Sequence, residues 1–178
     1  HAAFTCTDDT LHAAAALAAE LGVGVHIHVA EGPDDRTAGE RLQDLAGDDW
    51  HLVHCVLLDR HLAGTIAHNP RSNMNNSVGY AHPETWPNRI VLGTDGIGAD
   101  MLEEARLAYV KLRETDVRAS PDTVWRWLDN GYALFPEARD DEVTWNYDHA
   151  DSAWHVAFTP GVRALQVRSA DGEVLLAD

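Results

Sequence analysis

Short apolar segments alternate with helical segments along most of the 178-residue chain, and this alternation restricts the fold more than any other feature. The segments rich in Val, Ile and Leu are too short for buried helices, so they predict strands. They cover residues 23–29, 50–58, 63–70 and 88–96. Strands that alternate with helices are typical of βα units around a parallel sheet. The sequence therefore predicts an α/β fold.

The predicted helices carry recognisable ends. Residues 7–22 begin with Thr7, a good N-cap, and stop at Gly22, which suits a helix C-terminus. Residues 120–135 begin with Ser120 as the cap and Pro121 at the first helical position. Two further helices are expected over 36–47 and 100–115, the first of them weaker.

The composition excludes some classes of protein. The formal net charge is -16, which argues against nucleic acid as a partner because phosphate contacts need clustered Lys and Arg. No apolar run is long enough to predict a membrane span. Cys6 and Cys55 form no CxxC motif, so a reducing, cytoplasmic location is expected.

Each predicted strand ends in polar residues that are able to bind a metal or transfer a proton. In chain order these are His28 with Glu31, then His54, then His68 with Asn69, then Asp95. The C-terminal ends of parallel strands are where α/β barrels build their active sites. Four such ends in succession predict one shared site, and a high histidine content of 11 favours a metal or an acid–base centre.

Each of these residues also has a structural interpretation. His26 and His28 share one side of a strand and can be core histidines with hydrogen-bond partners, with Glu31 a solvated loop residue. A lone histidine in an apolar strand, such as His54, is more often structural than catalytic. A buried Asp95 is rare unless it is paired or bound to a metal. The segment 68–76, HNPRSNMNN, is typical of a loop.

Taken together, the sequence resembles the metal-dependent amidohydrolase superfamily, in its branch of cytosine-deaminase-like and ATZ/TRZ chlorohydrolase-like aminohydrolases. The resemblance rests on HAAFT, HIHVAE, VHCV, HNPRSNMNN and LGTDGIGADM, which follow one another between residues 1 and 101. It implies the second half, strands five to eight, of a distorted (β/α)8 TIM-type barrel. Residues 1–138 are then the half-barrel. Residues 139–178, where short alternating apolar runs predict a β segment, are then part of a small composite β domain.

The resemblance also implies roles for individual residues. His28 and Asp95 match the metal ligands of the fifth and eighth strands, and Glu31 matches the carboxylate that moves protons. His54 matches the histidine beside the attacking water, so Glu31, His54 and Asp95 form the expected catalytic set. The expected substrate contacts are His1, His68, Asn69 and Asn73.

The implied activity is hydrolysis of a C–N bond, or of a C–Cl bond, in a small heterocyclic substrate. The implied cofactor is a divalent metal, zinc first and iron as the alternative, which activates water. Such enzymes carry a His-x-His pair of metal ligands on their first strand, and no predicted strand precedes residues 23–29 here. The pair His26 and His28 is not that motif, because Glu31 and the HCV that follows place it on the fifth strand. The missing N-terminal half and a homo-oligomer are therefore expected. The alternative is a non-catalytic half-barrel that binds a small molecule or pairs with another chain.

Overall fold

The computed structural model describes residues 1–98, 100–146 and 161–177 of the chain. The fold divides into two compact units, His1–Ala99 and Asp100–Asp178, which are described separately. The predicted boundary between residues 138 and 139 stays a prediction.

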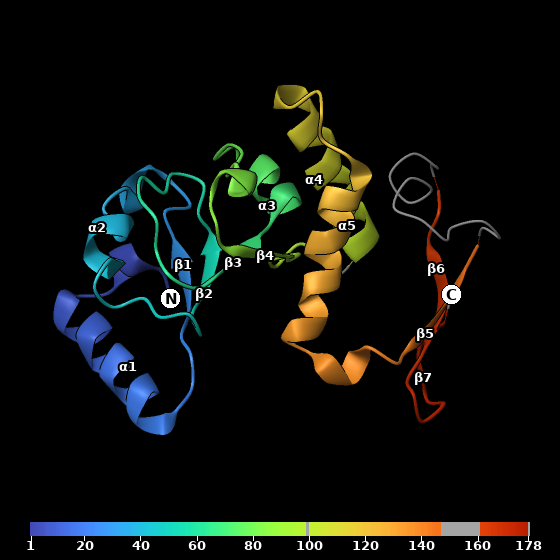
Figure 1. Ribbon diagram of the computed structural model, residues 1–178, viewed down its shortest axis with the longest axis horizontal. Coiled ribbons are helices and arrows are strands. Elements are labelled where there is room, and N and C mark those ends of the chain that lie inside the picture. The colour runs from blue at the N-terminus through green and yellow to red at the C-terminus, as the bar shows by residue number, and fades with distance from the viewer. Residues whose placement is uncertain (99, 147–160, 178) are drawn as a thin grey trace. The chain divides into compact units, whose positions relative to one another are not determined.

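The first unit is built on a parallel sheet with the strand order β1-β2-β3-β4 (Figure 1). The strands are β1 (His26–Val29), β2 (His51–His54), β3 (Thr65–His68) and β4 (Arg89–Leu92). All four predicted strands are present, and each is shorter than the apolar segment that predicted it. Because the strands are parallel, their C-terminal ends lie along the same edge of the sheet. The α/β class is confirmed, and the half-barrel and the strand numbering remain predictions.

Strand alternation separates two faces of this sheet. Ile27 and Val29 are buried, whereas His26 is exposed and His28 is half-buried. The rings of His26 and His28 lie on the same face, with centroids 6.5 Å apart, as the alternation predicted. His51, in register with His26 on β2, joins them there with a ring centroid 6.0 Å away.

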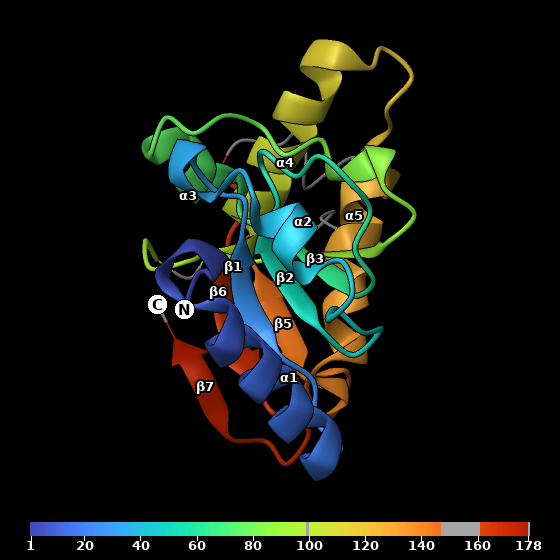
Figure 2. The ribbon, with the colours of Figure 1, turned by 90° about the vertical axis from the view of Figure 1, so that its left-hand side faces the viewer.

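Helices cover the face that carries Ile27 and Val29 (Figure 2). α1 (Asp8–Leu21) and α2 (Ala38–Leu42) contribute Leu11 and Leu42 to the same core cluster. Both predicted ends of α1 are confirmed: the Thr7 side chain accepts a hydrogen bond from Thr10 N, and Gly22 is left-handed with φ 66°. The predicted helix over 36–47 shortens to α2, and a 3-10 turn, η2 (Pro33–Asp35), precedes it. Other 3-10 turns are η1 (Ala3–Thr5) and η3 (Pro83–Thr85).

The segment that was predicted as a loop contains a helix, α3 (Pro70–Asn75). Pro70 was read as the stop of the preceding strand, and it does end β3. It also occupies the first position of α3, where its fixed φ favours a helix and its missing N–H is not needed. Four residues that we expected in a loop, Asn69, Ser72, Asn73 and Asn76, are spaced as one face of this helix.

The second unit joins two helices to a small antiparallel sheet. α4 (Met101–Thr115) and α5 (Pro121–Asp129) pack against each other, and the predicted Ser120 cap is confirmed. The helix predicted to reach Phe135 ends earlier, and the turns η4 (Asn130–Ala133) and η5 (Pro136–Ala138) follow. The sheet has the order β5-β6-β7, with β5 (Glu142–Trp145), β6 (Ala164–Arg168) and β7 (Val174–Ala177). Residues 147–160 of the predicted β segment lie outside the described residues.

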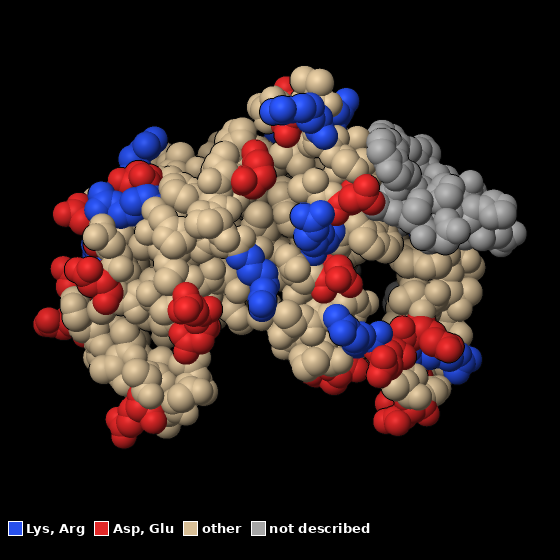
Figure 3. Space-filling view, in the orientation of Figure 1, with Lys and Arg blue, Asp and Glu red and all other residues tan. Residues whose placement is uncertain are grey.

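The surface charges are mixed rather than segregated. On the face shown in Figure 3, Lys and Arg side chains lie beside Asp and Glu side chains. Arg41 pairs with Asp8, and Lys111 pairs with Glu114. A search of the described helices finds none with the length and apolarity that a bilayer crossing requires.

Candidate metal centre

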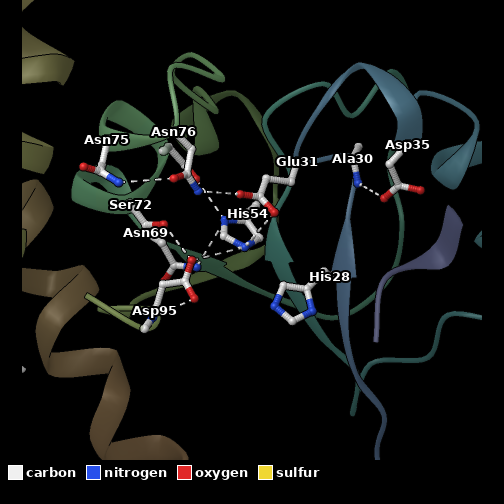
Figure 4. Close-up of polar contacts among 12 residues, drawn as sticks. His28, Ala30, Glu31, Asp35, His54, Asn69, Ser72, Asn75, Asn76 and Asp95 are labelled. Carbon is white, nitrogen blue, oxygen red and sulfur yellow. Dashed lines mark hydrogen bonds and ion pairs between the residues drawn. The ribbon is translucent and has the colours of Figure 1, made fainter. Parts of the chain in front are cut away.

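Three side chains from the ends of three strands converge in the first unit. Glu31 follows β1, His54 ends β2 and Asp95 follows β4. One ligand atom from each lies within 4.8 Å of the other two. Figure 4 shows the three side chains turned toward one another. The sequence assigned these three residues to one catalytic set, and the structure brings them together.

The backbone leaves the strands in a left-handed conformation at this edge. The φ angles are 50° at Ala30, 72° at His54, 55° at Cys55 and 53° at Asp95. Residues with a Cβ adopt this conformation at a cost of about 1–3 kcal/mol, and such residues cluster at functional sites. The turns lift the side chains out of the regular alternation of the strands and aim them over the sheet edge.

His54 is held at one ring nitrogen and faces carboxylates with the other. Its Nδ1 lies 2.8 Å from Asn73 Oδ1, so Nδ1 carries the proton and donates it. Its Nε2 lies 3.5 Å from Glu31 Oε2 and 3.8 Å from Asp95 Oδ2. Among the described residues, none forms a hydrogen bond with this buried Nε2. The Nε2 lone pair and the two carboxylate oxygens repel one another electrostatically, so a cation between them would stabilise the arrangement.

The Asp95 carboxylate is kept ionised by its neighbours. Ser72 Oγ donates a hydrogen bond of 2.6 Å to Oδ2, and the Gly96 N–H donates one of 2.7 Å to Oδ1. The Ser72 bond is the main reason that the pKa of Asp95 lies below its usual value, because it favours the charged form. An ionised carboxylate with a defined orientation is a suitable ligand for a hard or borderline cation.

Glu31 is oriented from α3. Asn76 Nδ2 donates a hydrogen bond of 3.2 Å to Glu31 Oε1, which leaves Oε2 facing His54. The Glu31 side chain is about one third exposed, with a relative exposure of 30%. It can therefore reach both the buried histidine and a molecule that enters from solvent.

His28 lies beside this group without belonging to it. Its ring stacks on His54 with centroids 5.3 Å apart and an interplanar angle of 26°. Its Nδ1 lies 3.4 Å from the carbonyl oxygen of His1, so Nε2 is the nitrogen that remains for a ligand. A ligating histidine commonly donates its second ring nitrogen to a backbone carbonyl in this way. The role of His28 as a metal ligand stays a prediction.

The expected substrate contacts occupy different positions. Asn69 and Asn73 are buried and face His54, with Asn69 Nδ2 3.5 Å from its Nδ1. His68 is fully buried, and burial lowers its pKa to about 3. His1 is exposed, and its ring contacts Thr5 Oγ1 at 3.1 Å. Their roles toward a substrate stay predictions.

Sequence reasoning missed two residues that orient the carboxylates, Ser72 and Asn76. The sequence contains a pattern that could have indicated them, because the polar residues at positions 69, 72, 73 and 76 have the spacing of one helix face. Tyr80 was missed as well, and its ring packs edge-on against His68 with centroids 5.2 Å apart.

The donor set of this site fits a divalent metal. It offers an imidazole nitrogen that faces two carboxylate oxygens, and zinc binds both atom types. Two observations support a metal here: the buried Nε2 of His54 has no hydrogen-bond partner among the described residues, and two carboxylates converge beside it.

The chain is similar to proteins of one family. The sequence pattern of the amidohydrolase family matches residues 1–128. A 5'-deoxyadenosine deaminase of Methanopyrus kandleri is 35% identical, and the match covers 67% of this chain and 34% of that protein. A 5-methylthioadenosine/S-adenosylhomocysteine deaminase of Desulfitobacterium hafniense is 38% identical, over 61% of this chain and 31% of that protein. The chain thus spans about a third of the length of these relatives.

Solved structures share the fold. An amidohydrolase from Brucella melitensis superposes with a TM-score of 0.73 and 17% identity, over 97% of this chain and 48% of that one. The atrazine chlorohydrolase from Arthrobacter aurescens complexed with zinc gives a TM-score of 0.68 and 21% identity, over 96% of this chain and 48% of that one.

The chain thus combines an α/β scaffold with His, Glu and Asp side chains that converge at one edge of a parallel sheet. The chain belongs to the amidohydrolase family.

Proposed function

We propose that this chain supplies the proton-transfer side chains, and part of the metal site, of an enzyme that hydrolyses a C–N bond in a small heterocyclic compound. A deamination of a nucleoside-like substrate is the reaction we favour, since the named relatives are deaminases of adenosine derivatives. The observation that carries the proposal is the convergence of Glu31, His54 and Asp95 at one sheet edge.

Asp95 and His28 are the residues that would hold the metal, and His54 Nε2 faces the same space. A divalent metal bound there would supply a Lewis acid that lowers the pKa of a water molecule toward neutrality. Asp95 is ionised, so it is able to accept a proton from that water while Ser72 keeps its carboxylate in place.

Glu31 and His54 act on the substrate side of the reaction. Glu31 is half-buried and held at one oxygen by Asn76, which leaves the other oxygen to carry a proton to the leaving nitrogen. His54 is fixed by Asn73, so its Nε2 keeps a constant direction toward the reacting group. With Nδ1 protonated, the Nε2 lone pair is able to accept a hydrogen bond from the attacking water without having to reorient.

The test is an assay of the chain joined, by fusion or in trans, to the N-terminal half of an amidohydrolase barrel. The substrate panel contains 5'-deoxyadenosine, cytosine and a chlorinated triazine. We expect release of ammonia from one of the first two compounds, loss of activity in Asp95→Asn, and no effect of Asp44→Asn, an exposed matched control. Turnover that survives in Asp95→Asn would contradict the proposal.

Dechlorination is the second candidate reaction, since a chlorohydrolase shares the fold. Chloride release from the triazine, without ammonia from the other two compounds, would favour it. If none of the three compounds reacts and zinc does not bind, a non-catalytic half-barrel is the better description.

A further inference from the structure

Asp35 is a buried carboxylate outside the converging group, four residues after Glu31. It ends the turn η2 and is only 2% exposed. Burial raises its pKa, which the amides that point to it partly oppose. A carboxylate is rarely buried to this degree without a structural task.

The contact that accounts for this burial is made with Ala30. The Ala30 N–H donates a hydrogen bond of 2.7 Å to Asp35 Oδ2, and the Ala30 carbonyl oxygen accepts one of 2.7 Å from the Leu57 N–H. Ala30 is fully buried and left-handed, with φ 50°. Figure 4 shows Asp35 on the side of Ala30 that faces away from His54.

The conformation of Ala30 decides where Glu31 points. In a continued strand, residue 31 would share the face of Ile27 and Val29, because side chains alternate. That face is the buried one against the helices. The left-handed turn at Ala30 takes Glu31 off this face and brings Oε2 to 3.5 Å from His54 Nε2.

From these contacts we infer that Asp35 is a positioning residue for Glu31. Its carboxylate holds the Ala30 amide in the left-handed turn, and the turn places the Glu31 carboxylate over the sheet edge. An effect of Asp35 on catalysis follows only if Glu31 has the acid–base role proposed above. The geometric part concerns only this chain and can be tested without activity.

The first experiment measures amide hydrogen exchange by NMR in the full 178-residue chain. In Asp35→Ala we expect Ala30 to exchange roughly 100-fold faster, through local opening, while Ile27 and Leu52 in the sheet change by less than about 3-fold. Asp35→Asn keeps an oxygen acceptor and should retain most of the protection. Asp34→Asn, an exposed neighbour, should behave like the wild type.

The second readout is the ¹³C shift of the Glu31 carboxyl, which reports its place beside His54 and Asn76. We expect it to move in Asp35→Ala and to stay in Asp35→Asn. Unchanged exchange at Ala30 and an unchanged Glu31 shift in Asp35→Ala would overturn the inference. A uniform acceleration of all sheet amides in both Asp35 variants would also overturn it, because Asp35 would then stabilise the fold as a whole.

Kinetics of the joined enzyme separate this inference from the proposed function. For a residue that places an acid–base group, kcat should fall by roughly 10-fold or more in Asp35→Ala, with KM within about 3-fold of wild type. If the wild-type enzyme turns over none of the compounds while Ala30 and Glu31 respond as expected, the proposed function fails and the positioning by Asp35 stands. A KM effect alone would show that Asp35 does not act through Glu31.

Discussion

The imidazole of His54 shows how single residues prepare this site. Asn73 Oδ1 accepts a hydrogen bond from one ring nitrogen, and the other nitrogen faces Glu31 and Asp95. Around it, Ser72 and Asn76 each donate a hydrogen bond to one of the two carboxylates. The side chains of His54, Glu31 and Asp95 are therefore each oriented by a hydrogen bond, which is the usual requirement for catalysis by preorganised groups.

The most specific prediction at this scale concerns Glu31. In the joined enzyme, where His28 and Asp95 are the proposed metal ligands and Glu31 is not one, Glu31→Gln should leave zinc content nearly unchanged. It should lower turnover by roughly 100-fold or more, as expected for a lost acid–base group. Elemental analysis and kcat measured on the same preparation provide the check. Glu40→Gln, on the exposed side of α2, is the control. If Glu31→Gln kept the turnover of the wild type, Glu31 would be a loop residue without a catalytic task.

At the scale of elements, the short helices α2 and α3 matter most, and the sequence predicted them least well. α3 carries three of the side chains that orient the site, yet its polar composition is typical of a loop. Its polar face is directed at His54, Glu31 and Asp95, so no apolar stripe marks the helix. The strands and α1 were predictable because their apolar residues and caps follow regular patterns, and α3 was not because function, rather than packing, selects its residues.

Arg41 of α2 binds the N-terminal segment through three hydrogen bonds. Its guanidinium group donates to the carbonyl oxygens of Ala3 and Cys6, both at 2.6 Å, and to Asp8 Oδ1 at 2.7 Å. Arg41→Met should therefore lower the free energy of unfolding by about 1–3 kcal/mol, because two partly buried backbone carbonyls lose their charged hydrogen-bond donor. Urea unfolding measures the loss of unfolding free energy, and Arg36→Met, at an exposed arginine just before α2, is the control. Equal stability of both variants would show that the segment is held without Arg41.

At the scale of the whole molecule, folding places two groups where they resist protonation. Burial lowers the pKa of His68 to about 3, against 6.5 in an unfolded chain, and the hydrogen bond from Ser72 lowers the pKa of the exposed Asp95. Between pH 6.5 and 3, His68 is protonated in the unfolded chain but stays neutral in the folded one, so the free energy of unfolding falls as the pH is lowered. The loss from His68 is up to about 1.4 kcal/mol per pH unit.

Urea midpoints at pH 7 and pH 5 check this pH dependence. We expect a lower midpoint at pH 5, a weaker pH dependence in His68→Asn, and an unchanged dependence in His61→Gln, which alters an exposed histidine. A wild-type midpoint that rises on acidification would contradict the assignment of His68 as a neutral, buried group.

The sequence also predicted which residues would meet, because strand ends of a parallel sheet share one edge. That rule placed Glu31, His54 and Asp95 at one edge together with His28, His68 and Asn69, and the family resemblance singled out the first three as the catalytic set. The hydrogen bonds that aim them do not follow from that rule, since they depend on left-handed turns at Ala30, His54 and Asp95 that no local sequence pattern announces. The turns at His54 and Cys55 also explain why β2 ends before its apolar segment does.

The site in this chain offers few protein ligands for a catalytic zinc, which usually has three or four. We therefore expect the chain alone to bind zinc weakly, to self-associate, and to show little hydrolysis. Joining it to an N-terminal barrel half should restore zinc binding and activity together. Stoichiometric, tight zinc with turnover in a monomer of the chain alone would contradict this expectation.

The most direct measurement is anomalous X-ray diffraction at the zinc edge from crystals of the joined protein. The account predicts one strong peak within bonding distance of Asp95 and His28, on the side that His54 Nε2 and Glu31 face. A protein that binds zinc elsewhere, with no peak at this sheet edge, would contradict the assignment of the converging side chains as a hydrolytic metal centre.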